Sequence, residues 1–129
     1  MERNILVIDD SAVMRKMVVK MLRLCGLSLG QVYEAGNGQE GLEKLTQHPV
    51  DLILADIHMP VMDGIEMFER TRSDPRNASL PFIFVSSDSS ATRVATLLEK
   101  GAGFVHKPLT PESLLEAISQ YAPQEKKNQ

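Results

Sequence analysis

The chain has 129 residues, which is the length of one domain of ordinary size, and 43% of them are apolar, enough for a core without disulfides or a structural metal. Its 14 Lys and Arg residues against 17 Asp and Glu residues give a formal net charge of −3, so we expect no direct binding to nucleic acid. No apolar run approaches the roughly 20 residues of a membrane span, and the single cysteine, Cys25, cannot form an internal disulfide. We therefore expect a cytoplasmic protein that does not bind membranes.

The first strand and helix are predicted at the start of the chain. Residues 5–8 are four consecutive apolar residues, mostly β-branched, which is typical of a strand buried on both faces. Ser11 can cap a helix that ends at Gly26. Apolar residues recur in this helix at three- and four-residue spacing, and we expect these to pack in the core: Val13, Met14, Met17, Val18, Met21, Leu22, Leu24 and Cys25.

Two further strand–helix units follow. The second has a strand over residues 31–35, a turn over residues 36–38 and a helix that ends before Pro49. The third has a strand over residues 50–55 that ends at Asp56, followed by a loop and a helix that begins near Asp63-Gly64. These units repeat the strand-then-helix order of the first.

The fourth strand is predicted over residues 82–85, before Ser86, and its helix ends at Gly101. The fifth strand covers residues 103–106, and Thr110 caps the last helix, with Pro111 in its first turn. Residues 123–129 are polar and are expected to form a tail after a domain over residues 1–122.

Five short apolar strands alternating with five helices predict a parallel sheet with helices on both faces, an α/β three-layer sandwich. Five units are too few for an eight-stranded barrel. A dinucleotide-binding fold is disfavoured because the first turn, Asp9-Asp10-Ser11, lacks the glycines that such folds use to hold phosphates.

Reactive side chains follow the strands directly. In an open parallel sheet, ligands bind beyond the carboxyl ends of the strands, where the strand order reverses. Asp9 and Asp10 follow the first strand and Asp56 follows the third, so three carboxylates converge if these strands are neighbours. Carboxylates that close repel one another unless one takes up a proton or a cation binds between them. A magnesium ion, which prefers carboxylate oxygens and water, satisfies this arrangement.

The motifs after the strands resemble those of one family, the receiver domains of two-component response regulators. The resemblance spans residues 3–122 and includes five pieces in order: Asp9-Asp10-Ser11, Asp56 with Met59-Pro60, Asp63-Gly64, Ser86 and Lys107-Pro108. It implies a flavodoxin-like sheet with strand order 2-1-3-4-5. Residues 9–16 are particularly similar to stand-alone chemotaxis regulators, which suggests a role in chemotaxis.

The resemblance implies a role for each matching residue. Asp56 is the expected phosphoacceptor, which receives a phosphoryl group from a phosphohistidine on a sensor histidine kinase or phosphotransfer protein. Asp10, Asp56 and the backbone carbonyl of His58 are expected to bind Mg²⁺ directly, and Asp9 mainly through metal-bound water. Lys107 is expected to pair with a phosphoryl oxygen, because phosphoryl transfer requires neutralisation of charge on the transferred group.

Two further residues match the family's switch positions. The hydroxyl of Ser86 is expected to move toward the phosphoryl group, and Phe104 to turn inward in response. A downstream protein would then bind through the fourth helix, the fifth strand and the fifth helix. On this interpretation the chain is a signalling switch that catalyses only its own phosphorylation and dephosphorylation. His58 and Asp88 flank the expected path of water to the acyl phosphate.

Three other functions remain open from the residues alone. A magnesium-dependent phosphatase with an aspartyl nucleophile is disfavoured because His58, and not an aspartate, stands two residues after Asp56. A flavin-binding carrier lacks its phosphate loop after the first strand. A receiver-like domain used only for docking would not need the intact acidic pair and lysine. Taken singly, Asp56 is also typical of a turn before Pro60, and Phe104 of a core residue.

Overall fold

The computed structural model describes residues 2–88 and 90–123, in which five strands alternate with five helices. The strands are β1 (Arg3–Ile8), β2 (Leu29–Ala35), β3 (Leu52–Ala55), β4 (Phe82–Ser86) and β5 (Gly103–His106). The helices are α1 (Ala12–Leu24), α2 (Gly38–Gln47), α3 (Gly64–Ser73), α4 (Ala91–Glu99) and α5 (Pro111–Tyr121). All ten predicted elements are present; β2 begins two residues earlier than predicted and β3 two residues later.

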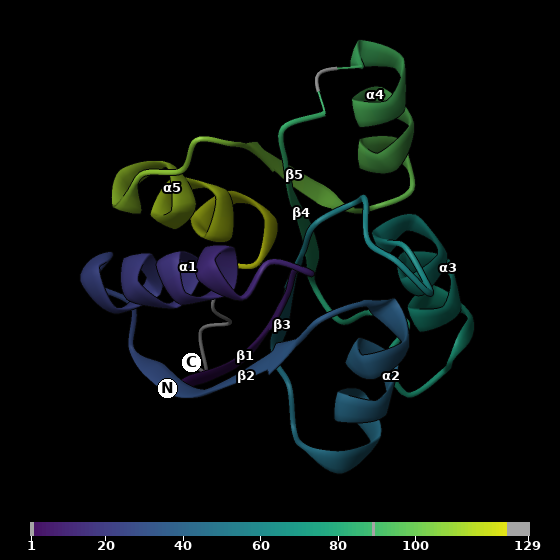
Figure 1. Cartoon of the computed structure of the whole chain (residues 1–129), viewed down its shortest axis with the longest axis horizontal. Coiled ribbons are helices and arrows are strands. Elements are labelled where there is room, and N and C mark those ends of the chain that lie inside the picture. The colour runs from purple at the N-terminus through teal and green to yellow at the C-terminus, as the bar shows by residue number, and fades with distance from the viewer. Residues whose placement is uncertain (1, 89, 124–129) are drawn as a thin grey trace.

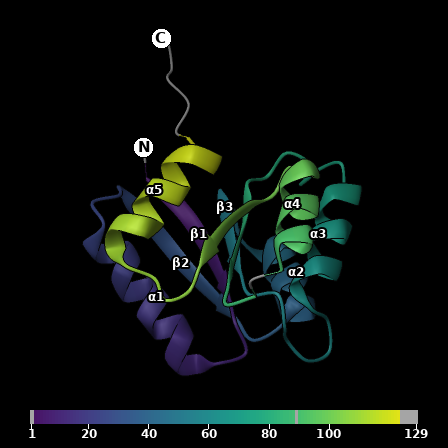
Figure 2. The ribbon, with the colours of Figure 1, turned by 90° about the horizontal axis from the view of Figure 1, so that it is seen from above.

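The strands form one parallel sheet in the order β2-β1-β3-β4-β5, which confirms the predicted order and the α/β sandwich. Helices α1 and α5 cover one face of the sheet, and α2, α3 and α4 cover the other (Figure 1). The view from above shows the same three layers, with the sheet between the two groups of helices (Figure 2). The order reverses between β1 and β3, so their carboxyl ends lie side by side at the centre of one edge.

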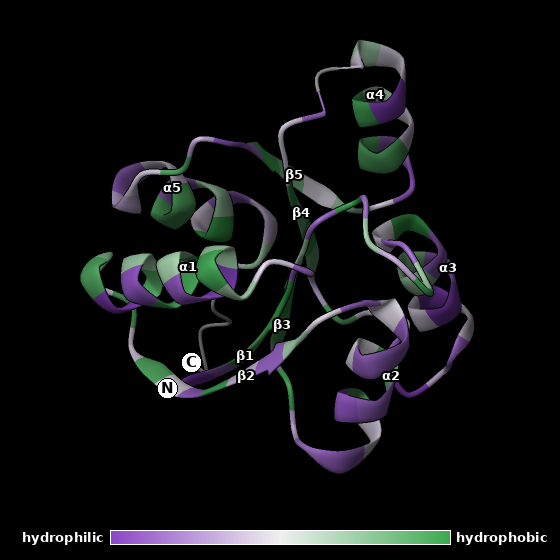
Figure 3. Cartoon of the chain, viewed as in Figure 1, coloured by the Kyte–Doolittle hydropathy of each residue, from purple (hydrophilic) through white to green (hydrophobic). Residues whose placement is uncertain are grey.

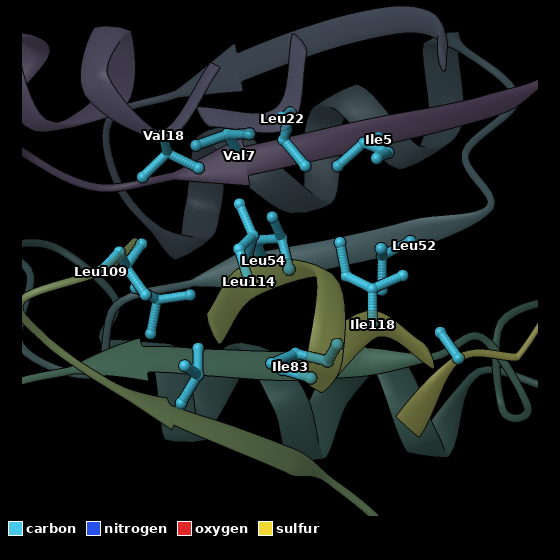
Figure 4. Packing of buried hydrophobic residues seen from close by; sticks show 14 residues of the cluster. Ile5, Val7, Val18, Leu22, Leu52, Leu54, Ile83, Leu109, Leu114 and Ile118 are labelled. Carbon is cyan, nitrogen blue, oxygen red and sulfur yellow. The ribbon is translucent and has the colours of Figure 1, made fainter. Parts of the chain in front are cut away.

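Each central strand contributes to two cores, because successive side chains point to opposite faces. Ile5 and Val7 of β1 pack with α1 and α5, and Leu6 and Ile8 pack on the other face. Figure 4 shows the first core, where Val18 and Leu22 of α1 and Leu114 and Ile118 of α5 meet β1, β3 and β4. Hydrophobic residues accordingly line the central strands, whereas the helices carry both polar and apolar residues (Figure 3).

Side-chain caps begin every helix, as the polar residues before them indicate. Each capping oxygen accepts a hydrogen bond from the backbone N–H three residues later, and the caps are Ser11, Asn37, Asp63, Ser90 and Thr110. At α5 the cap is reciprocal, because Ser113 also accepts from the backbone of Thr110. Within the described residues, 2–88 and 90–123, no helix is both long and apolar enough to cross a membrane.

The prediction that all eight apolar residues at the helical spacing of α1 face the core is wrong. Val18, Leu22 and Cys25 are buried, but Val13, Met17 and Leu24 are 72%, 45% and 64% exposed. The physical reason is that one face of α1 packs against the sheet and α5, and eight residues span a wider arc than this face.

Candidate functional site

The register of β1 and β3 brings the predicted acids together. Ile8 pairs with Ala55, the last residue of β3, and the backbone N–H of Asp56 donates to the carbonyl of Ile8 at 2.9 Å. Asp9 and Asp10 therefore leave the sheet beside Asp56. Carboxylate oxygens of Asp9, Asp10 and Asp56 all lie within 4.8 Å of one another, as the strand-end pattern predicted.

Lys107 provides a cation for two of these acids. Its Nζ lies 3.2 Å from Asp9 Oδ2 and 3.4 Å from Asp56 Oδ2. The β4–β5 pairing places this lysine, since its backbone N–H donates to the carbonyl of Ser86 at 3.0 Å. The side chains of Lys107, Asp9 and Asp56 are 19%, 8% and 14% exposed, so these three side chains are largely shielded from water.

Backbone groups fix the two inner carboxylates. Asp9 Oδ1 accepts from the N–H of Ser11 at 2.9 Å, and Asp56 Oδ1 accepts from the N–H of Ile57 at 2.8 Å. Each acid thus has one oxygen held by the backbone and the other directed at Lys107. Two side chains fixed in this way need little rearrangement to engage a reacting group between them.

Close packing against the backbone of Asp56 explains why a glycine, Gly64, follows Asp63 at the start of α3. Its N–H donates to the carbonyl of Ile57, and a Cβ at this position would lie 2.1 Å from the carbonyl oxygen of Asp56. Any larger residue would push the start of α3 away from the backbone of Asp56. The Asp63-Gly64 pair is therefore part of the site's support, not only a helix start.

Ser86 ends β4 on the same edge of the sheet, but its hydroxyl contacts its own loop. Ser86 is buried, and its Oγ accepts from the backbone N–H of Asp88 at 3.1 Å. The two predicted phosphoryl partners thus differ, because Lys107 contacts the acids directly whereas Ser86 is engaged by the β4–α4 loop.

The carboxylate of Asp88 links its own loop to the loop after β3 and to α4. Its carboxylate accepts from His58 Nε2 at 3.1 Å, from Arg93 of α4, and from the backbone N–H of Ser90 at 2.9 Å. These hydrogen bonds, led by that of Ser90, lower the pKa of Asp88 from 3.8 to about 2. The predicted water path included His58 and Asp88, but nothing in the sequence pointed to Arg93, which lies five residues after Asp88 across a helix cap.

Phe104 lies in β5 opposite Phe84 of β4 and is 8% exposed. Its ring centroid lies 4.8 Å from that of His106. Phe104 is therefore largely buried and belongs to the core cluster that contains Phe84 and Leu97.

The donor set suits a hard divalent cation. Three carboxylates carry three negative charges, and Lys107 is the only cation paired with any of them among residues 2–88 and 90–123. The remaining charge and the oxygen-only ligands match the preference of Mg²⁺, which is held by a few carboxylates and water. Asp10 is exposed, so the cluster opens to solvent on its side.

Comparisons with known proteins agree with this geometry. The family model of the response regulator receiver domain matches residues 5–119. Chemotaxis protein CheY1 of Helicobacter pylori is 33% identical over 117 residues, which cover 89% of this chain and 93% of that protein. Chemotaxis protein CheY4 of Vibrio cholerae superposes with a TM-score of 0.82 at 30% identity, over 94% of this chain and 99% of that one.

A third similar structure is the complex of CheX with CheY, BeF3 and Mg²⁺ from Borrelia burgdorferi, with a TM-score of 0.82 and 27% identity. The similarity covers 92% of this chain and 87% of that one. The phosphatase, flavin and docking-only alternatives gain no support from these comparisons. The chain belongs to the response regulator receiver domains, which accept a phosphoryl group in two-component signal transduction.

Proposed function

We propose that Asp56 is the phosphoacceptor of this receiver and that Asp9, Asp10 and Lys107 complete its site. The observation that carries this assignment is the position of the Asp56 carboxylate, which contacts Lys107 Nζ and lies within 4.8 Å of the other two acids. Asp10 is exposed and does not pair with Lys107, and Asp9 is buried. Asp56 thus combines a nearby cation with partial access from solvent.

In the proposed reaction, an oxygen of the Asp56 carboxylate attacks the phosphorus of a phosphohistidine. A P–O bond forms, the P–N bond breaks, and the imidazole leaves with the electron pair and takes up a proton. The ammonium group of Lys107 offsets charge that remains on the phosphoryl oxygens. The product is an acyl phosphate on Asp56, which water later hydrolyses.

Asp10, Asp56 and the backbone carbonyl of His58 would hold Mg²⁺ directly, and Asp9 would hold it mainly through water. When bound, the ion neutralises charge on the transferred group and orients it for in-line displacement. The three clustered carboxylates support this ligand set. Lys107 remains within reach of Asp9 and Asp56, so it anchors both of these acids.

The partners follow from the reaction. A sensor histidine kinase or phosphotransfer protein supplies the phosphoryl group, and a downstream protein binds through α4, β5 and α5 after Ser86 and Phe104 rearrange. The crystallised complex of a similar CheY with CheX supports binding of this receiver to another protein. Residues 1–122 form the receiver and residues 123–129 a polar tail, of which 124–129 lie outside the described residues. The lone cysteine supports a cytoplasmic location.

Incubation with acetyl phosphate and Mg²⁺ tests the assignment. We expect intact-mass spectrometry to show one added phosphoryl group on the wild-type protein and none on Asp56→Asn. Asp51→Asn is the matched control, because Asp51 is an exposed acid at the opposite end of β3, where it accepts from the N–H of Asn4. An adduct that persists unchanged in Asp56→Asn would disprove the assignment.

A further inference from the structure

Arg15, at the end of the first turn of α1, links the acidic loop to the edge strand β2. Its Nη1 donates to the backbone carbonyl of Asp9 at 2.6 Å, and its Nε donates to Glu34 Oε1 at 3.0 Å. The side chains of Arg15 and Glu34 are 20% and 33% exposed, so both are partly shielded from water. A planar guanidinium that donates to two fixed acceptors holds them in one relative orientation.

This contact controls the peptide group that joins the two neighbouring acids. The carbonyl of Asp9 and the N–H of Asp10 belong to the same planar peptide unit, so fixing the carbonyl fixes where Asp10 leaves the chain. The peptide on the other side of Asp9 is also anchored, because its N–H donates to the carbonyl of Ala35 at 3.1 Å. Both anchors lead to β2, directly through Ala35 and indirectly through Arg15 and Glu34.

The buried Asp9 has further support from Ser11 and Lys107, whereas the side chain of the exposed Asp10 forms no hydrogen bond within residues 2–88 and 90–123. The position of Asp10 therefore depends on its backbone. We propose that Arg15, clamped by Glu34, is a positioning residue that holds the Asp9–Asp10 peptide in the orientation required for divalent-cation binding. This inference rests on the proposed function of the acidic cluster.

A role for Arg15 as a positive charge and a role as a positioning residue predict opposite effects of its removal on Mg²⁺ affinity. If Arg15 acts only as a positive charge near an acidic site, its loss reduces repulsion and Mg²⁺ binds more tightly. If Arg15 positions the acidic loop, its loss allows the Asp9–Asp10 peptide to rotate and Mg²⁺ binds more weakly. Mutation of a residue that orients a metal ligand typically lowers metal affinity 10- to 100-fold.

Isothermal titration with Mg²⁺ alone, on the full chain, separates the two accounts. We expect about 10-fold weaker binding for Arg15→Met. Arg15→Lys retains the charge but cannot donate to both acceptors from a planar group, so we expect binding between that of the wild type and that of Arg15→Met. Arg70→Met is the matched control, because Arg70 forms an exposed pair with Glu66 on α3, and it should bind Mg²⁺ like the wild type.

Phosphorylation by acetyl phosphate gives a second readout. The Mg²⁺ concentration at half-maximal rate should rise about 10-fold in Arg15→Met, whereas the maximal rate at saturating Mg²⁺ should stay within about twofold, because Arg15 touches no reacting group. Circular dichroism establishes that each variant is folded. If Arg15→Met does not fold, Arg15→Lys decides, since the charge account predicts wild-type affinity for it.

Mg²⁺ binding by folded Arg15→Met that equals or exceeds wild-type binding would overturn the inference. So would wild-type affinity in Arg15→Lys. A wild-type protein that neither binds Mg²⁺ nor accepts a phosphoryl group would instead disprove the proposed function, and the role of Arg15 would fall with it. The two failures are therefore distinguishable in one set of titrations.

Discussion

Asp10 differs from its two neighbours in that its carboxylate forms no ion pair with any of residues 2–88 and 90–123. Asp9 and Asp56 each contact Lys107 Nζ, whereas Asp10 lies within 4.8 Å of both acids and is exposed. Without a bound cation, a carboxylate in this position destabilises the fold, because Lys107, which pairs with the other two acids, offsets the added repulsion only in part. Binding of a divalent cation reverses the sign of its contribution.

The substitution Asp10→Asn should therefore stabilise the metal-free protein and weaken the metal-bound one. We expect the free energy of unfolding to rise by about 1 kcal/mol in EDTA, a modest value because Asp10 is exposed. In saturating Mg²⁺ the variant should be less stable than the wild type, which gains free energy from binding the ion. Urea denaturation with and without Mg²⁺ measures both values, with Asp51→Asn as the control; equal changes in the two conditions would contradict this account.

The lowered pKa of Asp88 predicts that its contribution to folding stability changes with pH only well below neutrality. Its pKa is lowered to about 2 by hydrogen bonds from Ser90, His58 and Arg93, so the folded state favours the carboxylate. A depressed pKa contributes stability that is complete above the unfolded-state value of 3.8 and is lost as the pH falls through about 2. The difference in stability between the wild type and Asp88→Asn should therefore shrink as the pH falls from 3.8 to about 2.

Direct titration of Asp88 by NMR, through the chemical shift of its side-chain carboxyl carbon, measures this pKa. We expect a value near 2 in the wild type and a higher one in Arg93→Met, because one of its hydrogen-bond donors is removed. A wild-type pKa at the ordinary value of 3.8 would show that the contacts of His58, Ser90 and Arg93 do not form in solution.

At the scale of elements, α1 shows that an apolar pattern does not by itself define a buried face. Leu22 and Leu24 lie on the same helix, yet Leu22 is fully buried and Leu24 is 64% exposed. We expect Leu22→Ala to lower the free energy of unfolding by about 2–5 kcal/mol and Leu24→Ala by less than about 0.5 kcal/mol. Urea denaturation of both variants tests this, and similar losses would mean that α1 is rotated relative to the structure.

The strands and caps could be predicted from the sequence because their signals are local. Continuous apolar runs define the central strands, and Ser11 and Thr110 satisfy backbone N–H groups only a few residues away. The positions of the three acids also followed, since parallel strands end at one edge of the sheet and each acid directly follows a strand.

The contacts that support the site could not be predicted in the same way. Arg15 meets Glu34 across 19 residues, and His58 meets Asp88 across 30. Which charged side chain reaches which partner depends on the tilt of each helix and on loop geometry, and neither leaves a periodic pattern in the sequence. Arg15 resembled its neighbours Lys16 and Lys20 as a charge on the polar side of a helix.

For the whole molecule, the sheet order connects the acidic site to a distant surface. β3 carries Asp56, β4 carries Ser86, and β5 lies beside β4 at the edge of the sheet and carries Phe104. The proposed phosphoacceptor and the two proposed switch residues therefore lie on or directly after successive neighbouring strands. A change at Ser86 can reach α4 through the Asp88 loop, because Asp88 contacts both Ser86 and Arg93.

We expect phosphorylation to change amide hydrogen exchange over α4 and β5 in the wild type. In Ser86→Ala the acceptor and Lys107 remain, so Asp56 should still be phosphorylated, but the exchange of α4 and β5 should stay close to that of the unphosphorylated protein. Mass spectrometry measures both quantities on one sample. Ser87→Ala, the neighbouring hydroxyl, is the control, and a wild-type response in Ser86→Ala would exclude the proposed switch role.

A crystal structure of the protein with Mg²⁺ and beryllium trifluoride, a mimic of the phosphoryl group, would show directly whether Asp56 is the acceptor. We predict that beryllium binds an oxygen of Asp56, that Lys107 Nζ and Ser86 Oγ contact its fluorines, and that Mg²⁺ binds Asp10 and Asp56. Beryllium trifluoride on a different carboxylate, or Lys107 directed away from its fluorines, would contradict the proposed roles of Asp56 and Lys107.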